Sequence, residues 1–363
     1  MSKHLPGRLG DPAMTLLTDP RIDPRIAGAI AAAGDIADVL GGLKADAPME
    51  ECLDYCQRFD DAVVAARPLL EATMPAFDDV EQHTQVIKGV DDNDITLFIH
   101  RPKTRDAVLP GILHLHGGGM VTLMAIDPVY RRWRNELARK GLVVIGVEFR
   151  NGGGHLGNHP FPAGLNDCAS ALRWTHANRQ QLGFSSLVVS GESGGGNLSL
   201  ATALKAKREG FLDCIQGVYA MCPYISGAYA DPPEQLLSMQ ENDGYTLTCQ
   251  MMGALSRVYD PQGKNTANPL AWPYHASVDD LRGLPPHVIS VNELDPLRDE
   301  GLVFLRKLLT AGNQATARQI PATNHAGDTS YPDIAPEHFH ETQRSLLQFA
   351  RSVGDKGARM PSH

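Results

Sequence analysis

Residues 187–198 read LVVSGESGGGNL, in which an apolar run ends in small residues and one acid before a helix-like stretch begins. Within it, residues 191–195 match G-x-S-x-G, a pattern in which a strand turns sharply into a helix and exposes a serine. Glycines two positions before and two after the serine leave room for this turn. The stretch therefore predicts a strand, a tight elbow and a helix that present Ser193 as a nucleophile. An ordinary glycine-rich loop is the alternative, because the chain contains 35 glycines.

Strand-like runs alternate with helix-like runs on both sides of this elbow. We expect strands at residues 95–100, 111–116, 142–149, 186–191, 217–222, 287–292 and 315–320. We expect helices at residues 128–140, 162–181, 196–209, 299–311 and 336–352. Several strand-like runs are continuously apolar, as strands covered on both faces must be. The alternation predicts an α/β fold with a mostly parallel central sheet, helices on both faces, and strand carboxyl ends that meet at one edge.

Two segments interrupt this alternation. Residues 1–80 begin with stretches rich in Pro, Gly and Asp and then look helical over residues 46–75. Residues from about 224 to 285 are rich in Tyr, Pro, Met and Trp and contain no clear central strand. We therefore expect a catalytic domain over residues 81–363, with residues 1–80 and the 224–285 insertion forming a cap above the strand ends.

The composition argues against several classes of partner. The chain has 363 residues, of which 42% are hydrophobic, and its formal net charge is −9. An acidic chain without a basic run is a poor candidate for binding nucleic acid or an anionic membrane surface. The sequence contains neither a signal-peptide pattern at its start nor a run of about 18 apolar residues that could span a membrane. We expect a soluble, cytoplasmic protein.

The six cysteines form no C-x-x-C pair. They are Cys52, Cys56, Cys168, Cys214, Cys222 and Cys249. Cys52 and Cys56 are four residues apart in an expected helix and could share one face as a metal or redox pair. Buried free thiols in a reducing compartment are the favoured interpretation.

A second glycine run follows the second expected strand. Residues 116–120 read HGGGM, and three glycines at a strand end let backbone N–H groups approach a negatively charged oxygen closely. Such a run commonly accompanies G-x-S-x-G. We expect the N–H groups of Gly118, Gly119 and Gly194 to form an oxyanion hole, although the sequence leaves open which HGGG glycines donate. His116 is expected to hydrogen-bond to the loop backbone rather than to act as a base.

A serine nucleophile requires a base and a group that orients the base. Asp295 directly follows the strand expected at residues 287–292, which places it at the edge where the site should form. Glu293 is the alternative acid. Asp299 is expected to cap or begin the next helix instead.

The candidate base is a histidine beyond the last expected strand. His325 lies in the loop PATNHAGD at the same edge of the sheet. The order Ser193, Asp295, His325 is the order in which such residues follow one another in α/β-hydrolases. His338 and His340 fall within the last expected helix and are expected to be surface or packing residues.

These motifs together resemble one enzyme family. HGGGM, GESGGGN, NELDPLRDEG and the late histidine are similar to those of the hormone-sensitive-lipase family of α/β-hydrolase carboxylesterases, over roughly residues 80–352. The usual family elbow reads GDSAGG, so Glu192 replaces an aspartate and Gly194 an alanine. The family's usual H-x-F becomes His325-Ala326-Gly327, and the missing aromatic should widen or loosen the pocket beside the base.

The resemblance implies an α/β-hydrolase fold with a helical cap and a carboxylesterase that uses Ser193, His325 and Asp295 through an acyl-enzyme. It implies no metal or organic cofactor. The expected substrate is a small-molecule ester, with a lactone as a further option, because aromatic residues of the insertion could shape an apolar pocket or form the cap core. These aromatic residues are Tyr224, Tyr229, Tyr245, Trp272 and Tyr274.

Two alternative functions stay open at the level of sequence. A serine peptidase or amidase could use the same residues, although no propeller-like repeat accompanies them. A non-catalytic binding protein could reuse the fold to hold a small ligand, because a fold alone does not determine function. The N-terminal arm could also contribute to a homodimer.

Overall fold

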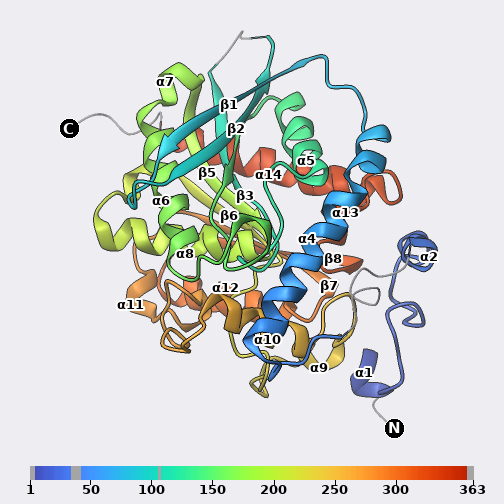
Figure 1. Ribbon diagram of the computed structural model, residues 1–363. Helices are drawn as coiled ribbons and strands as arrows, with labels where there is room; N and C mark the ends of the chain where they lie inside the picture. The colour runs from blue at the N-terminus through green and yellow to red at the C-terminus, as the bar shows by residue number, and fades with distance from the viewer. Residues whose placement is uncertain (1–4, 34–41, 105–107, 358–363) are drawn as a thin grey trace.

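The computed structural model describes residues 5–33, 42–104 and 108–357 of the chain (Figure 1). Eight strands form one sheet in the order β1-β2-β4-β3-β5-β6-β7-β8. The strands are β1 (Val80–Lys88), β2 (Asp94–Pro102), β3 (Leu109–Leu115), β4 (Val143–Glu148), β5 (Phe184–Glu192), β6 (Gly217–Met221), β7 (His287–Leu294) and β8 (Ala315–Asn324). The strands from β4 to β8 pair in parallel, and β2 pairs antiparallel with both β1 and β4.

Helices cover both faces of this sheet. The main helices of the layers are α5 (Pro128–Arg139), α6 (Ala163–Ala177), α8 (Gly194–Glu209), α12 (Arg298–Thr310) and α14 (Pro336–Gly357), and the short α7 (Arg179–Leu182) follows α6. On one face α5 packs on β2 and β4, and α14 packs on β3, β5 and β6. On the other face α6, α8 and α12 cover the sheet. The predicted α/β fold, the seven predicted strands and the five predicted helical regions are confirmed.

Strand β1 was not predicted. Its sequence is mostly polar, and within it only Val80 and Ile87 are buried. An edge strand that is solvated on most of its surface lacks the apolar run by which buried strands are found. It pairs along its whole length with β2.

The N-terminal segment and the insertion lie against each other. The segment contains α1 (Gly7–Gly10), α2 (Pro24–Ala33) and the long α4 (Met49–Ala72). The insertion contains α9 (Ser238–Glu241), α10 (Cys249–Tyr259), η3 (Pro273–His275) and α11 (Val278–Leu281). Helix α4 contacts α10 and α5, and α1 contacts α9, as the blue and orange-yellow ribbons of Figure 1 show.

Most of the insertion's aromatic residues form packed core. Tyr224 and Tyr229 stack with ring centroids 4.4 Å apart, and Trp272 meets both rings edge-on. Tyr229, Tyr245 and Trp272 are buried almost completely. Tyr224, Tyr229 and Trp272 belong to the main hydrophobic core, and Tyr245 packs with residues of the N-terminal segment, so the insertion is anchored to the rest of the molecule.

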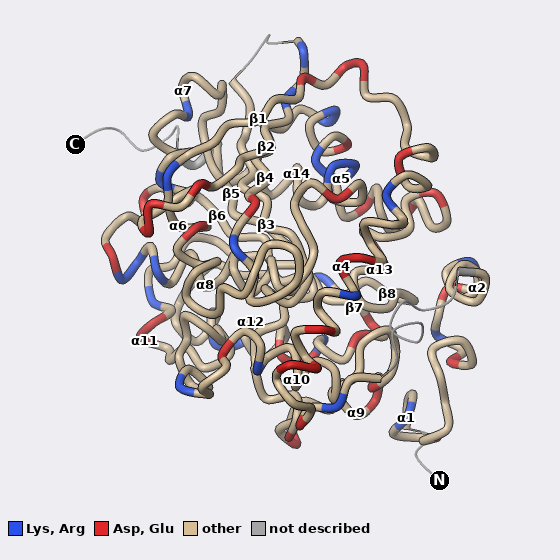
Figure 2. Tube along the Cα trace, in the orientation of Figure 1, with Lys and Arg blue, Asp and Glu red and all other residues tan. Residues whose placement is uncertain are grey.

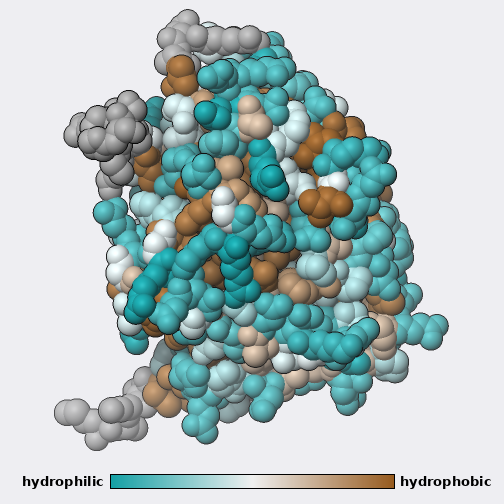
Figure 3. Space-filling view, turned by 90° about the vertical axis from the view of Figure 1, so that its left-hand side faces the viewer, coloured by the Kyte–Doolittle hydropathy of each residue, from teal (hydrophilic) through white to brown (hydrophobic). Residues whose placement is uncertain are grey.

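The surface carries charges of both signs. Acidic and basic residues are interspersed around the periphery, whereas the central strands are mainly uncharged (Figure 2). The face in Figure 3 is mostly hydrophilic, and its apolar patches are small. Of the described helices, none combines the length and the apolar character that crossing a membrane requires.

Candidate active site

Ser193 lies at a tight turn between β5 and α8. Its φ of 57° and ψ of −117° are a strained combination for a residue with a side chain. A Cβ placed on Gly191 would lie 2.2 Å from the Leu115 carbonyl oxygen, and one on Gly195 would lie 1.9 Å from the same atom. Only glycine fits at these two positions, so the two glycines permit the sharp elbow that the sequence predicts.

The three glycines expected to supply the oxyanion hole lie near this elbow, because Gly118 and Gly119 line the same cavity as Ser193 and Gly194 directly follows it. Gly118 and Gly119 have φ values of 95° and 60°, which glycine adopts readily. Among the described residues, none accepts a hydrogen bond from either N–H group. Gly194 is the first residue of α8, where an N–H group has no partner within the helix. A Cβ on Gly194 would lie 2.7 Å from the Gly119 nitrogen, so the two segments are in close contact.

His116 supports this loop and does not face the base position. Its Nδ1 lies 2.9 Å from the Gly117 carbonyl oxygen, and its ring stacks on Phe149 with centroids 4.1 Å apart. Burial lowers the pKa of His116 to about 3, so the ring is neutral at pH 7. The predicted structural role of this histidine agrees with these contacts.

Asp295 and His325 form a buried hydrogen-bonded pair. Asp295 follows β7, and His325 follows β8, so neighbouring parallel strands bring them to one edge. The Asp295 Oδ2 atom lies 2.8 Å from His325 Nδ1, and Oδ1 accepts a hydrogen bond from the Leu297 N–H. The Asp295 side chain is fully buried, whereas that of His325 is 10% exposed. The imidazole is therefore held by the acid while one edge remains accessible.

The environment favours the protonated form of His325. Burial alone would lower the pKa of His325, but the Asp295 carboxylate and the nearby Cys222 raise it overall, well above its ordinary value. A carboxylate that stabilises an imidazolium is what acyl transfer requires of the group behind the base.

The alternative acids have other partners. Glu293 Oε2 accepts a hydrogen bond from the Ala322 N–H, which ties the end of β7 to β8. Asp299 lies in the first turn of α12, where it pairs with Arg298 and accepts from the Ser238 N–H. Neither carboxylate contacts the imidazole of His325 in the described structure.

Ser193 and His325 line one cavity of about 270 Å³. Its other walls are largely apolar and come from the elbow, the glycine loop, the N-terminal segment and the insertion. The lining includes Tyr55, Phe59, Thr122, Leu123, Tyr224, Leu247, Met251, Met252 and Leu255. Five aromatic residues of the insertion were expected either to shape a pocket or to form core, and of these five Tyr224 alone lines this cavity. Among the described residues Ser193 has no hydrogen bond to His325, and such bonds often shorten only when substrate binds.

The sequence analysis expected the N-terminal segment above the strand ends but did not name the residues of α4 that line this cavity. Tyr55 and Phe59 are four residues apart, a spacing that places two aromatic rings on one face of a helix. The signal was therefore present in the sequence, but nothing local indicated that this face would reach the site.

Cys222 lies beside the candidate base. Its sulfur, a nitrogen of His325 and an oxygen of Asp295 are all within 4.8 Å of one another. Donors of this kind can hold a metal ion, but here Asp295 and His325 already share a hydrogen bond. All six cysteines are free and buried, as the favoured interpretation predicted.

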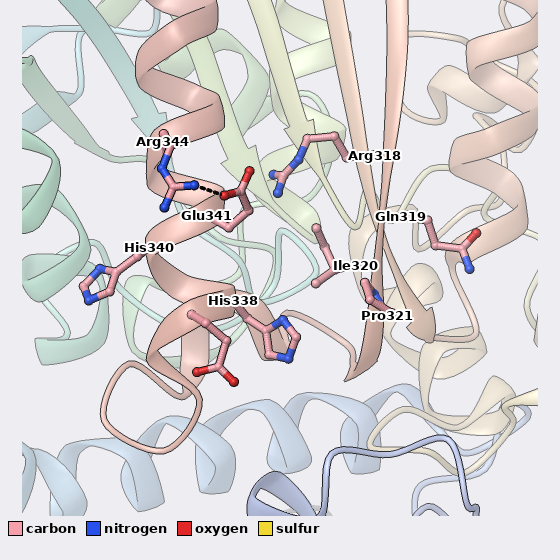
Figure 4. Close-up of a pocket in the computed structure, with 9 residues that line it drawn as sticks. Arg318, Gln319, Ile320, Pro321, His338, His340, Glu341 and Arg344 are labelled. Carbon is pink, nitrogen blue, oxygen red and sulfur yellow. Dashed lines mark hydrogen bonds and ion pairs between the residues drawn. The ribbon is translucent and has the colours of Figure 1, made fainter.

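A larger groove of about 590 Å³ lies on the outer side of the molecule, between β8 and α14 (Figure 4). Its lining mixes charged, polar and apolar side chains, and Glu341 pairs with Arg344, three residues further along α14. His338 and His340 lie here, away from Ser193, as predicted for surface or packing residues. The groove contains none of the candidate catalytic groups, so we place the site in the smaller cavity.

The chain resembles several known proteins. It matches the family described as alpha/beta hydrolase fold over residues 112–328. It is 43% identical to a brefeldin A esterase, described as a bacterial homologue of human hormone sensitive lipase, over 97% of this chain and 99% of that chain, with a TM-score of 0.87. Esterase Est22 is 36% identical over 93% of this chain and 99% of its own, with a TM-score of 0.83.

A curated relative gives the same assignment. Carboxylesterase NlhH of Mycobacterium tuberculosis is 30% identical over 281 residues, which cover 76% of this chain and 83% of that protein. The match to the family spans more than half of the chain and includes both Ser193 and His325. The chain therefore belongs to the α/β-hydrolase family, and within it to the carboxylesterases related to hormone-sensitive lipase, which are serine carboxylic ester hydrolases.

Proposed function

We propose that the protein hydrolyses carboxylic esters through an acyl-enzyme on Ser193, with His325 as base and Asp295 as the group that orients it. The observation that carries this proposal is the 2.8 Å contact between Asp295 and His325, in the same cavity as the serine of the elbow. A serine hydroxyl is a weak nucleophile, and an adjacent base that is oriented by a third group activates it.

The proposed reaction proceeds in two steps. His325 accepts the Ser193 proton as the hydroxyl oxygen attacks the ester carbonyl carbon, and it then donates that proton to the leaving alcohol. Water, deprotonated by the same imidazole, attacks the acyl-enzyme and releases the acid. Asp295 keeps the proton-bearing Nδ1 of His325 directed away from Ser193 and stabilises the imidazolium. These steps use only side chains, backbone groups and water.

The oxyanion is assigned to the N–H groups of Gly118, Gly119 and Gly194. Their lack of partners in the described structure supports this assignment, because groups that bind the oxyanion must be free beforehand. A helix N-terminus also favours negative charge, and Gly194 begins α8.

The cap is proposed to consist of residues 1–80 and the insertion at about 224–285. Both supply walls of the cavity, with Phe59 from the first segment and Met252 from the second. A largely apolar cavity of about 270 Å³ suits a hydrophobic ester or a lactone. The similar brefeldin A esterase makes brefeldin A one substrate to test.

The first test compares wild type with Ser193→Ala on p-nitrophenyl esters from acetate to palmitate. We expect hydrolysis by wild type and its loss in the variant, which should fold normally because the turn itself depends on the glycines. Activity retained by Ser193→Ala would contradict the assignment of the nucleophile.

Covalent labelling separates this proposal from a non-catalytic binding protein. A fluorophosphonate should label Ser193 in wild type, and peptide mapping should find no label in Ser193→Ala. A folded wild type that neither hydrolyses any ester nor reacts with the probe would favour the binding protein. Anilide analogues of the best ester measure the competing amidase activity directly.

A further inference from the structure

Glu192 is a buried carboxylate directly before the nucleophile that the proposed mechanism does not use. It is the last residue of β5 and is only 6% exposed. Its Oε1 atom accepts a hydrogen bond of 2.9 Å from the Gly117 N–H, and Oε2 lies 3.1 Å from His114 Nε2. A buried carboxylate is costly unless it is fully paired, and here both oxygens have a donor.

His114 completes this arrangement from the neighbouring strand. It lies on β3, is 1% exposed, and has no partner for Nδ1 in the described part of the chain. Because a carboxylate only accepts hydrogen bonds, Nε2 must carry the proton toward Glu192. The carboxylate therefore joins the strand before the nucleophile to the strand before the glycine loop.

The Glu192 carboxylate binds the first residue of the loop that carries the proposed oxyanion donors. Gly117 immediately precedes Gly118 and Gly119, and the loop's other backbone bonds stay within the loop or lead away from β5, such as those from the Val121 and Thr122 N–H groups to the Gly118 carbonyl. The Glu192 carboxylate thus connects the first glycine of the loop directly to the residue before Ser193.

Both departures from the usual GDSAGG elbow meet at this loop. An aspartate in place of Glu192 would reach about 1.5 Å less, the length of one C–C bond. An alanine in place of Gly194 would put its Cβ 2.7 Å from the Gly119 nitrogen. Glu192 is longer than the usual aspartate, and Gly194 lacks the methyl group of the usual alanine. Both differences suit a glycine loop that lies at one position close to the elbow.

We propose that Glu192 is a positioning residue that holds residues 117–119 at the distance from Ser193 at which their N–H groups bind the oxyanion. This inference rests on the proposed function. The reach of the side chain is what matters, because an uncharged acceptor of the same length can still bind the Gly117 N–H. The charge strengthens the bond without being required for it.

The decisive comparison is Glu192→Gln against Glu192→Asp. Glutamine keeps the reach and loses the charge, since its amide oxygen accepts from Gly117 and its amide nitrogen can donate to the other tautomer of His114. Aspartate keeps the charge and loses the reach. We expect the glutamine variant to stay within roughly tenfold of the wild-type kcat, as neutral bonds replace charge-assisted ones. We expect the aspartate variant to lose roughly 10²-fold, as when an oxyanion donor is removed.

A second readout isolates the oxyanion hole. Trifluoromethyl ketone analogues of the best ester form a tetrahedral oxyanion on the serine. In the aspartate variant their inhibition constants should therefore increase in parallel with the loss of kcat, while KM changes little. Glu209→Gln, an exposed residue at the far end of α8, serves as the matched control and should equal wild type in both assays. Thermal melts of each variant establish that it is folded.

The outcomes separate cleanly. Parallel losses of kcat and ketone affinity in the aspartate variant, with glutamine close to wild type, support the proposal. Equal effects of both substitutions, a glutamine variant worse than aspartate, or a kcat loss without any loss of ketone affinity would overturn it. Absence of ester hydrolysis by wild type would instead reject the proposed function, so the two failures are distinguishable.

Discussion

At the scale of single residues, the hydrogen bond between Asp295 and His325 determines the pH range in which the imidazole can act as a base. Because the carboxylate raises the pKa of His325 above its ordinary value, the acidic limb of kcat/KM should lie above pH 6.5. Activity falls below that limb, since a protonated imidazole cannot accept the serine proton. Asp295→Asn should move the limb to lower pH and reduce the plateau by roughly 10⁴-fold.

Glu293→Gln is the matched control for this experiment. Its amide oxygen can still accept from the Ala322 N–H, and the side chain does not contact His325 in the described structure. The control should keep the wild-type profile. A loss in Glu293→Gln comparable to that in Asp295→Asn would make Glu293 the acid. pH–rate profiles of the three proteins on one p-nitrophenyl ester measure both effects.

The candidate site residues could be predicted from the sequence where a motif within a few neighbouring residues identifies them. The glycines around Ser193 and the acid and histidine after two strand ends have signatures within a few residues of each site. The contacts of Glu192 with Gly117 and of Cys222 with His325 have none, because they join different strands. The strand order, with β5 beside β3 and with β7 between β6 and β8, brings those side chains together.

At the scale of elements, a buried carboxylate of α4 binds the backbone of two loops near the site. Asp60 is fully buried and accepts hydrogen bonds of 2.8 Å from the N–H groups of Leu123 and His155. Asp60→Ala leaves both N–H groups without this acceptor, at a cost of about 1–3 kcal/mol each. Thermal unfolding should occur at a lower temperature, and KM should rise because Phe59 on the same helix lines the cavity.

Asp54→Ala on the same helix is the control, because Asp54 is exposed and pairs with Arg58, one turn away. Such surface pairs contribute about 0–1 kcal/mol. Equal melting temperatures for Asp60→Ala and wild type would mean that the position of α4 does not depend on this carboxylate.

Helix α4 also shows what a sequence can predict. The helix itself was predicted from residues 46–75, whereas the hydrogen bonds that attach it to the loops near the site were not.

Strand β1 is an element that the sequence analysis did not predict at all. Its pairing with β2 satisfies its backbone, yet its side chains are mostly solvated and carry no apolar pattern. A strand of this kind is determined by the neighbour that it pairs with, so periodicity alone could not identify it.

At the scale of the whole molecule, a partly buried ionic network joins the N-terminal segment, the insertion and helix α12. Glu241 of α9 pairs with Arg298 of α12 at 2.8 Å and with Arg21 of the N-terminal segment. The adjacent Asn242 donates to the backbone carbonyl of Asp295. Three parts of the chain distant in sequence therefore meet beside the loop that carries the proposed acid.

This network should make stability depend on pH. Burial alone would raise the pKa of Glu241, but Arg298 and Arg21 lower it overall. A lowered folded-state pKa contributes stability above the unfolded value of about 4.3, and this stability is lost as pH falls through the folded pKa. Glu241→Gln should lower the free energy of unfolding by about 1.5–3 kcal/mol at pH 7, the range for hydrogen bonds to charged groups, because its arginine partners are partly exposed. Below about pH 4 its difference from wild type should shrink, because wild type then loses the same charge.

Urea unfolding at pH 7 and at pH 3.5, followed by circular dichroism, measures this directly. Glu209→Gln removes an exposed acid that pairs with Lys205 and should change stability by less than about 1 kcal/mol at either pH. If Glu241→Gln is as stable as wild type at pH 7, the three segments are held by their apolar contacts alone. If its deficit is the same at both pH values, the loss comes from altered packing, because only an ionised Glu241 makes the difference depend on pH.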